Sequence, residues 1–143
     1  MRNLIKIAFF FPLFWACEKS NETNPIIHSV VVGPTLIKSM EDSVKITLSY
    51  EDPDGDLGEN SPGVKNLEII DSRNQVSYWY RIPELSPSGS EIHIQGKLEV
   101  IIPQLVISQG KTSETFTLSA QITDRAGNLS ESVSSQELEI KEP

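Results

Sequence analysis

The sequence predicts an all-β fold, arranged as a single two-sheet β-sandwich of about seven strands. Several segments alternate apolar and polar residues with a period of two, which is typical of half-buried strands. Clusters of Gly, Pro, Asn and Asp separate these segments at the short intervals that are found in sandwiches. No segment shows the 3.6-residue period of an amphipathic helix, so we expect little helix.

Seven segments are the expected strands. In residues 44–50 and 114–123 every second residue is apolar, and these two are the clearest. A short polar link joins residues 64–70 to residues 75–82 and predicts a hairpin. Gly96 lies within the long fifth segment, residues 91–102, and either bends it or splits it in two; we expect one bent strand. The complete set is residues 26–32, 44–50, 64–70, 75–82, 91–102, 114–123 and 132–141.

The first 16 residues predict a signal peptide. Arg2 and Lys6 precede an uncharged, mostly apolar run at residues 7–16. Ten helical residues span only about 15 Å of a hydrocarbon core of about 30 Å, so a membrane-spanning anchor is disfavoured. The run ends in LFWAC, which resembles the lipobox of bacterial lipoproteins. That resemblance implies that Cys17 is lipidated and becomes the first mature residue; the alternative is a secretory signal in which Cys17 is incidental.

Composition supports export of one folded domain. Cys17 is the only cysteine, and an odd cysteine in an exported protein needs an explanation such as lipidation. Without residues 1–16 the 143-residue chain keeps 127 residues, and its net charge changes from −8 to −10 because two basic residues are lost. This charge disfavours nucleic acid as a partner. We expect a polar tether at residues 17–25 and a domain at residues 26–143, attached by lipid to the outer membrane and facing the periplasm or the cell surface.

The loop after the second expected strand is strongly acidic. Its sequence, EDPDGDLGE at residues 51–59, places five carboxylates among one proline and two glycines, which end the strand. Five negative charges in nine residues repel one another unless water, salt or a cation intervenes. The loop is therefore either a solvated turn or a site for a hard cation, and calcium takes six to eight oxygen ligands.

In the expected sandwich, the loops after the second and sixth strands emerge at the same end. Asp124 and Asn128 would then lie near the aspartates of the acidic loop. Their sequences, YEDPDGDLG and ITDRAGNLS, resemble loop motifs of immunoglobulin-like and cadherin-like modules in bacterial surface proteins. The resemblance implies an immunoglobulin-like domain of fibronectin type III-like strand order. Cadherin-like modules use such loops for calcium, and the candidate ligands here are Asp52, Asp54, Asp56, Asp124 and Asn128.

Other side chains offer weaker signals. Alternation sends Tyr78 and Tyr80 to one face of their strand and Trp79 to the other, so these aromatic residues form either a binding surface or part of the core. His28 and His93 lie on separate expected strands with no nearby cysteine or second histidine. Zinc needs three or four convergent ligands, so we expect both to be structural or surface residues.

No nucleophile elbow or paired base is present in the sequence, and we expect no enzyme. The best prediction is a lipid-anchored module for adhesion, scaffolding or partner binding, stabilised by calcium. Its protein or glycan partner is not defined by the sequence. The alternative is a carbohydrate-binding accessory lipoprotein of a polysaccharide-uptake system.

Overall fold

The computed structural model describes residues 23–143. The predicted signal peptide, the lipidation site at Cys17 and most of the tether lie outside the described residues. Within residues 23–143 the chain is all-β and forms three sheets, without helix. No helix long and apolar enough to cross a lipid bilayer is found in this part of the chain.

Ten strands occur in the described part of the chain. Their bounds are β1 (Ile26–Gly33), β2 (Leu36–Lys38), β3 (Val44–Asp52), β4 (Leu67–Asp71), β5 (Ser77–Tyr80), β6 (Ile94–Ile102), β7 (Ser113–Phe116), β8 (Leu118–Ile122), β9 (Val133–Ser134) and β10 (Leu138–Lys141).

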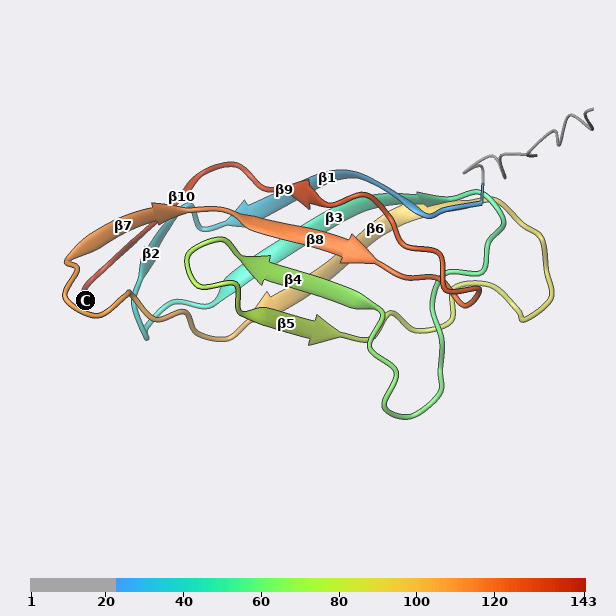
Figure 1. Cartoon of the computed structure of the whole chain (residues 1–143), viewed down its shortest axis with the longest axis horizontal. Coiled ribbons are helices and arrows are strands. Elements are labelled where there is room, and N and C mark those ends of the chain that lie inside the picture. The colour runs from blue at the N-terminus through green and yellow to red at the C-terminus, as the bar shows by residue number, and fades with distance from the viewer. Residues whose placement is uncertain (1–22) are drawn as a thin grey trace, which may run out of the picture.

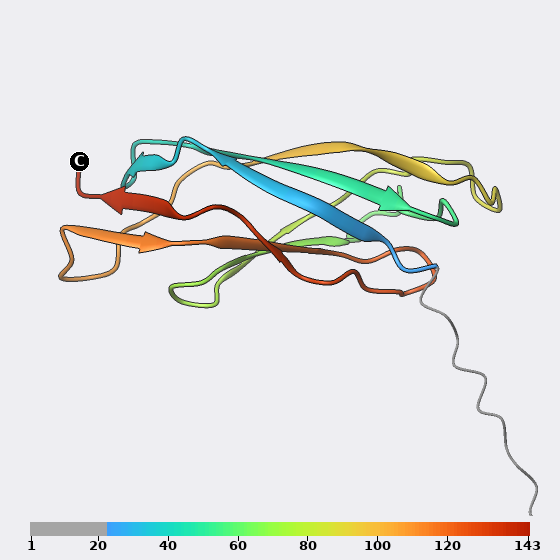
Figure 2. The same cartoon turned by 90° about the horizontal axis from the view of Figure 1, so that it is seen from above.

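The strands lie in two layers (Figure 2). One layer is the antiparallel sheet β1-β3-β6, and the other is the antiparallel sheet β5-β4-β8-β9. The third sheet, β2-β10-β7, lies at one end of the molecule (Figure 1), where β10 pairs in parallel with β2 and antiparallel with β7. This arrangement is consistent with a β-sandwich.

The structure has more strands than the seven expected segments because two segments are broken and one strand was missed. The segment 114–123 is interrupted at Thr117, whose amide donates to the Ser72 hydroxyl at 3.0 Å and whose carbonyl accepts from the Ser72 amide at 3.1 Å. The segment 132–141 is divided into β9 and β10, which join different sheets. The missed strand, β2, has three residues and is too short for alternation to reveal.

The core lies between the layers and follows the predicted alternation. In β3 the inward residues Val44, Ile46 and Leu48 have no exposed surface. Burying each such side chain stabilises the fold by about 1.5–3 kcal/mol. The strand β6 is continuous and in unbroken register with β3, as expected for one strand. Gly96 leaves room there for the ring of Tyr50, since a Cβ at this position would lie 2.9 Å from the Tyr50 hydroxyl.

Candidate metal centre at the acidic loop

The acidic loop, residues 51–59, begins with the last two residues of β3, Glu51 and Asp52, and is fixed to the core at Leu57. Asp52 and Leu57 both have no exposed surface. The Leu57 amide donates to Asp52 Oδ2 at 2.7 Å, which closes a tight turn around the carboxylate. A fully buried aspartate therefore stands at the base of the loop, with one oxygen satisfied by the backbone.

Two glycines allow the loop to pack tightly against residues 82–92. Gly55 and Gly58 have φ values of 73° and 90°, a region that side-chain-bearing residues rarely adopt. A Cβ would lie 1.9 Å from the Ile92 carbonyl oxygen at the first position and 2.0 Å from the Pro83 carbonyl oxygen at the second. These two glycines thus end the strand and also permit close approach of the two backbones.

The loop brings three carboxylates together. One oxygen each from Asp52, Asp54 and Asp56 lies within 4.8 Å of the other two. The Oδ1 atoms of all three residues are buried and have no hydrogen-bond partner within residues 23–143. Oxygens that each lie about 2.4 Å from one calcium ion are at most about 4.8 Å apart, so this donor set fits calcium.

The cluster is electrostatically unfavourable as it stands. Two unit charges no more than 4.8 Å apart repel by at least about 3 kcal/mol at an effective dielectric constant of about 20. Burial raises the pKa of Asp52 to about 6; the Leu57 amide opposes this rise, and Asp54 and Asp56 add to it. Burial also raises the pKa of Asp56, as do Asp124 and Asp54, while the Ala126 amide and Arg125 oppose the rise. A bound divalent cation would remove this repulsion.

An open pocket of about 770 Å³ lies beside the cluster. Asp54 and Asp56 line it, although their Oδ1 atoms are themselves buried. Thr23, at the start of the described chain, lines the same pocket, which places Thr23 and the acidic loop at one end of the domain. The full lining is Thr23, Pro53, Asp54, Asp56, Gly89, Ser90, Glu91 and Arg125.

The 124–128 turn lies against the acidic loop, yet its side chains do not join the three carboxylates. Asp124 Oδ1 accepts from the Asn128 amide at 2.7 Å, and Asp124 Oδ2 accepts from Asn128 Nδ2 at 2.8 Å. These short local bonds occupy both oxygens of Asp124 and hold the turn. The turn instead supports Asp56 through its backbone, since the Ala126 amide donates to Asp56 Oδ2 at 2.9 Å.

Arg125 is a residue of this region that sequence reasoning missed. Its guanidinium group donates to the Gly55 carbonyl at 3.5 Å and to the Ser86 carbonyl at 3.3 Å, and it pairs with Glu84 at 3.2 Å. It therefore links the acidic loop to the loop after β5 and places one positive charge near the cluster. Nothing in the local sequence indicates these partners, which lie about 40 and 70 positions away along the chain.

The aromatic triplet does not form one surface. Tyr78 and Tyr80 pack against the core, and the Tyr80 hydroxyl donates to the Ile101 carbonyl of β6 at 2.9 Å. Trp79 lies on the opposite face of β5, paired across the strands with Glu68, and is 45% exposed. Only Trp79 is therefore placed to contact a ligand on the outside of the sheet.

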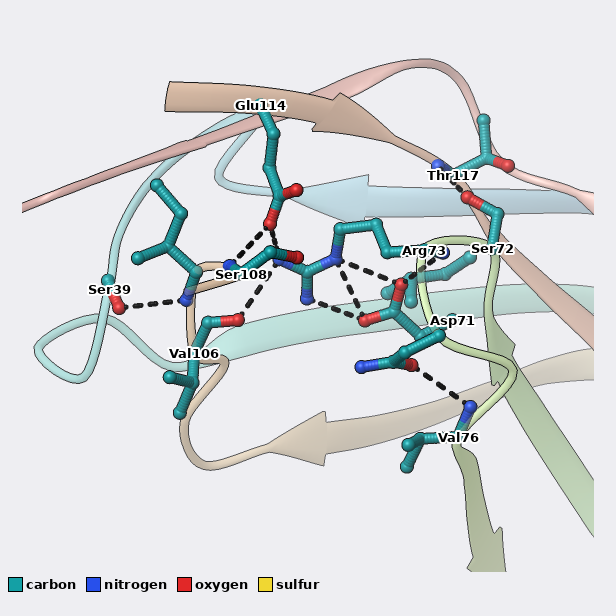
Figure 3. A network of polar contacts seen from close by, with 12 residues as sticks. Ser39, Asp71, Ser72, Arg73, Val76, Val106, Ser108, Glu114 and Thr117 are labelled. Atoms are coloured by element: carbon teal, nitrogen blue, oxygen red, sulfur yellow. Dashed lines mark hydrogen bonds and ion pairs between the residues drawn. The ribbon is translucent and has the colours of Figure 1, made fainter. Parts of the chain in front are cut away.

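A second polar cluster, centred on Arg73, connects three segments that are distant in sequence (Figure 3). The Arg73 guanidinium group pairs with Asp71 at 2.6 Å and with Glu114 at 2.9 Å, and it lies 4.1 Å from the centre of the Phe116 ring. It also donates to the Val106 carbonyl at 3.1 Å. All charged groups of this cluster are paired with one another, so we interpret it as a stabilising contact between segments that has no free ligand position.

The Glu114 carboxylate is stabilised as an anion by this cluster. Burial opposes ionisation, but donors from Ser108, Lys111 and Arg73 outweigh burial and lower the pKa of Glu114 to about 2. The Ser108 amide donates at 2.8 Å and Lys111 Nζ pairs at 3.0 Å. The connection between β6 and β7 is thereby fixed to the β4–β5 hairpin.

The described residues thus contain one group of buried, unpartnered oxygen donors, and it has the chemistry of a hard-cation site. By contrast, Asp71, Glu114 and Glu84 pair with arginine side chains, and both oxygens of Asp124 accept hydrogen bonds from Asn128. Comparison of the chain with protein-family models, with characterised proteins and with solved structures found no match.

Proposed function

We propose that this protein is a lipid-anchored, extracytoplasmic β-sandwich module that works by adhesion, scaffolding or partner binding, and that calcium stabilises its anchor-proximal end. The amino-terminal sequence supports the proposed location. An apolar run too short to span a bilayer ends in the LFWAC motif, which contains the single cysteine, Cys17. The proposed module is not an enzyme.

The strand order supports an immunoglobulin-like domain of fibronectin type III-like order. Three strands, β1-β3-β6, face four strands, β5-β4-β8-β9, and consecutive strands β4 and β5 form a hairpin within the second sheet. In this interpretation β2 continues the chain direction of β1 for three residues. It leaves the β1-β3-β6 sheet and pairs in parallel with β10. Such domains commonly serve as binding or spacing modules on cell surfaces.

One observation carries the calcium proposal: Asp52 is fully buried and its Oδ1 has no partner among the described residues, while Asp54 and Asp56 present oxygens to the same point. Three carboxylates supply half of the minimum coordination that calcium requires. Water and the carbonyl groups of the glycine-containing loop complete it in our proposal. Asp54 and Asp56 face the pocket, so the ion exchanges with the solution.

Thermal unfolding of the full chain in a mild detergent tests the calcium proposal. Calcium binds only the folded state, since unfolding disperses the ligands, and extracellular modules bind calcium with Kd of about 0.1–1 mM. At 10 to 100 times Kd the stabilisation is about 1.4–2.7 kcal/mol, which corresponds to a rise in Tm of about 4–10 °C. An unchanged Tm between EDTA and about 10 mM calcium would leave the solvated turn as the correct account.

A second candidate function is carbohydrate binding, and the exposure of Trp79 favours it. The indole lies on the outer face of the four-stranded sheet beside Glu68, which offers a flat apolar surface next to hydrogen-bonding groups. In this candidate the protein is an accessory lipoprotein of a polysaccharide-uptake system. A glycan array distinguishes the two functions, because only the second requires direct saccharide binding.

A further inference from the structure

A separate group of ligand-bearing side chains lies on the outer face of the β1-β3-β6 sheet. The carboxylate of Glu51 stands between two imidazole rings. His28 Nε2 lies 2.9 Å from Glu51 Oε2, and His93 Nε2 lies 3.0 Å from Glu51 Oε1. The two histidines are 65 positions apart in the sequence, yet both direct Nε2 at one carboxylate.

These residues lie in or directly beside three neighbouring strands. His28 lies in β1, Glu51 lies in β3, and His93 directly precedes β6. The β1–β3 register shifts between Ile27 and Ser29, so His28 is the extra residue of a β-bulge. Bulges redirect a side chain away from the regular alternation and are common beside functional sites. Here the bulged residue, His28, is the one whose side chain contacts Glu51.

The three side chains also retain freedom to move. The side chains of His28 and His93 are 49% and 54% exposed, and that of Glu51 is 28% exposed. Each imidazole now contacts a different oxygen of the carboxylate. Rotation of the two exposed rings toward a common point would replace these contacts with bonds to a metal ion, without a change in the buried core.

We propose that His28, Glu51 and His93 form a second metal site, which binds Zn²⁺ or a similar transition-metal ion. Imidazole nitrogen suits zinc, nickel and copper, whereas calcium prefers oxygen ligands. Two histidines and one carboxylate form the ligand set of zinc sites that keep a fourth position open to water or another ligand. The site is distinct from the acidic cluster and does not depend on the calcium proposal.

Zinc titration of the full chain tests this proposal, with Cys17→Ser as the background because a free thiol binds zinc itself. The protein, in a mild detergent, competes with a chromophoric zinc indicator in the presence of about 10 mM calcium, which occupies the acidic cluster if that site binds calcium. We expect one zinc ion per chain. His28→Gln and His93→Gln should each weaken zinc binding by about tenfold or more, since each removes a ligand.

Glu99→Gln is the matched control, because Glu99 pairs with Lys45, lies outside both proposed metal sites and touches neither histidine. Its zinc affinity should equal that of the parent chain. Equal loss in this control, or parental affinity in both histidine variants, would overturn the proposal. Long-range ¹H–¹⁵N spectra of the histidine rings provide a second measurement on the folded parent chain: zinc should shift the Nε2 signals of both rings, and a shift of neither or of only one would also overturn it.

Discussion

Glu51 and Asp52 are consecutive residues at the end of β3, and their carboxylates serve opposite faces of the sheet. Glu51 contacts two exposed histidines on the outer face, whereas Asp52 is fully buried and contributes one oxygen to the group it forms with Asp54 and Asp56. Alternation along a strand explains the division, because neighbouring side chains point to opposite faces. The two proposed metal sites are therefore adjacent in sequence and can be altered separately.

The first prediction separates ligands from supporting residues in the acidic cluster. Asp54→Asn should abolish most of the calcium-dependent rise in Tm, because Asp54 contributes one of the three convergent oxygens. Asp124→Asn should keep the rise, since both oxygens of Asp124 already accept from Asn128. It should lower stability by about 1 kcal/mol with and without calcium, because an amide keeps only one acceptor oxygen and one of the two bonds is lost. Differential scanning calorimetry in EDTA and in calcium measures both effects.

The second prediction concerns the approach of the acidic loop to residue 92. Gly55→Ala should destabilise the fold by about 3 kcal/mol or more, because the new methyl group would overlap the Ile92 carbonyl as well as strain the backbone. Gly110→Ala is the control: its φ of 80° is similar, but no atom lies within 4 Å of the added carbon. It should cost about 1–2 kcal/mol. Equal urea midpoints for the two variants would contradict this account.

The third prediction is a pH dependence of the Arg73 cluster. The pKa of Glu114 in the folded state is about 2, below its ordinary value of 4.5, so ionised Glu114 stabilises the fold above about pH 5. That contribution is lost as the pH falls from about 5 to about 2. Glu114→Gln should therefore be about 2–3 kcal/mol less stable than the parent chain at pH 7, and the difference should narrow toward pH 2.

Urea unfolding at a series of pH values measures the difference between the two chains. Glu41→Gln is the control, because the Glu41 pair with Lys38 is exposed on both sides. Exposed pairs contribute about 0–1 kcal/mol, so this variant should follow the parent curve. A pH-independent gap between Glu114→Gln and the parent chain would mean that packing, not charge, is responsible.

The fourth prediction tests the carbohydrate alternative. If the protein binds saccharides through the outer face of the four-stranded sheet, Trp79→Ala should remove the signal on a glycan array. Stacking of a sugar on an aromatic ring requires the exposed indole. Tyr78→Phe should keep the signal, since Tyr78 packs against the core. Saccharide binding that survives Trp79→Ala would locate the binding surface elsewhere.

The fifth prediction concerns the anchor. Cys17→Ser should release the protein from the membrane fraction or block its processing, because the acyl chains would have no attachment site. Cell fractionation with immunoblotting measures the distribution, and Ser20→Ala within the tether serves as the control that leaves it unchanged. A variant that remains in membranes and is cleaved normally would contradict the lipoprotein assignment.

Local patterns predict the β-rich fold and the gathering of the acidic residues. Alternation in residues 44–50 identifies the inward face of β3, and Asp52, Asp54 and Asp56 approach one another because a short loop leaves them little separation. The expected participation of Asp124 fails to appear in the cluster, since hydrogen bonds to Asn128 satisfy its carboxylate locally.

Contacts between distant segments are not visible in such patterns. The histidines at positions 28 and 93 meet only because β1 and β6 flank β3 and a bulge occurs at the first of them. Arg73 likewise finds Glu114 across 41 positions, in a segment expected to be a simple continuous strand. Sheet order and register decide these pairs, and both depend on the whole chain.

The presence of Thr23 in the pocket beside Asp54 and Asp56 has a consequence for the ionic surroundings of the acidic cluster. Five residues separate Thr23 from Cys17, and the six steps along the chain span at most about 20 Å. A lipid at Cys17 would hold the cluster close to the bilayer surface. Where that surface carries anionic lipid, a potential of about −30 mV enriches divalent cations about tenfold at the surface itself, and this enrichment decays over a Debye length of about 8 Å. The anchored domain would then bind calcium at a lower bulk concentration than the released domain, to a degree set by how closely the tether holds the cluster to the surface.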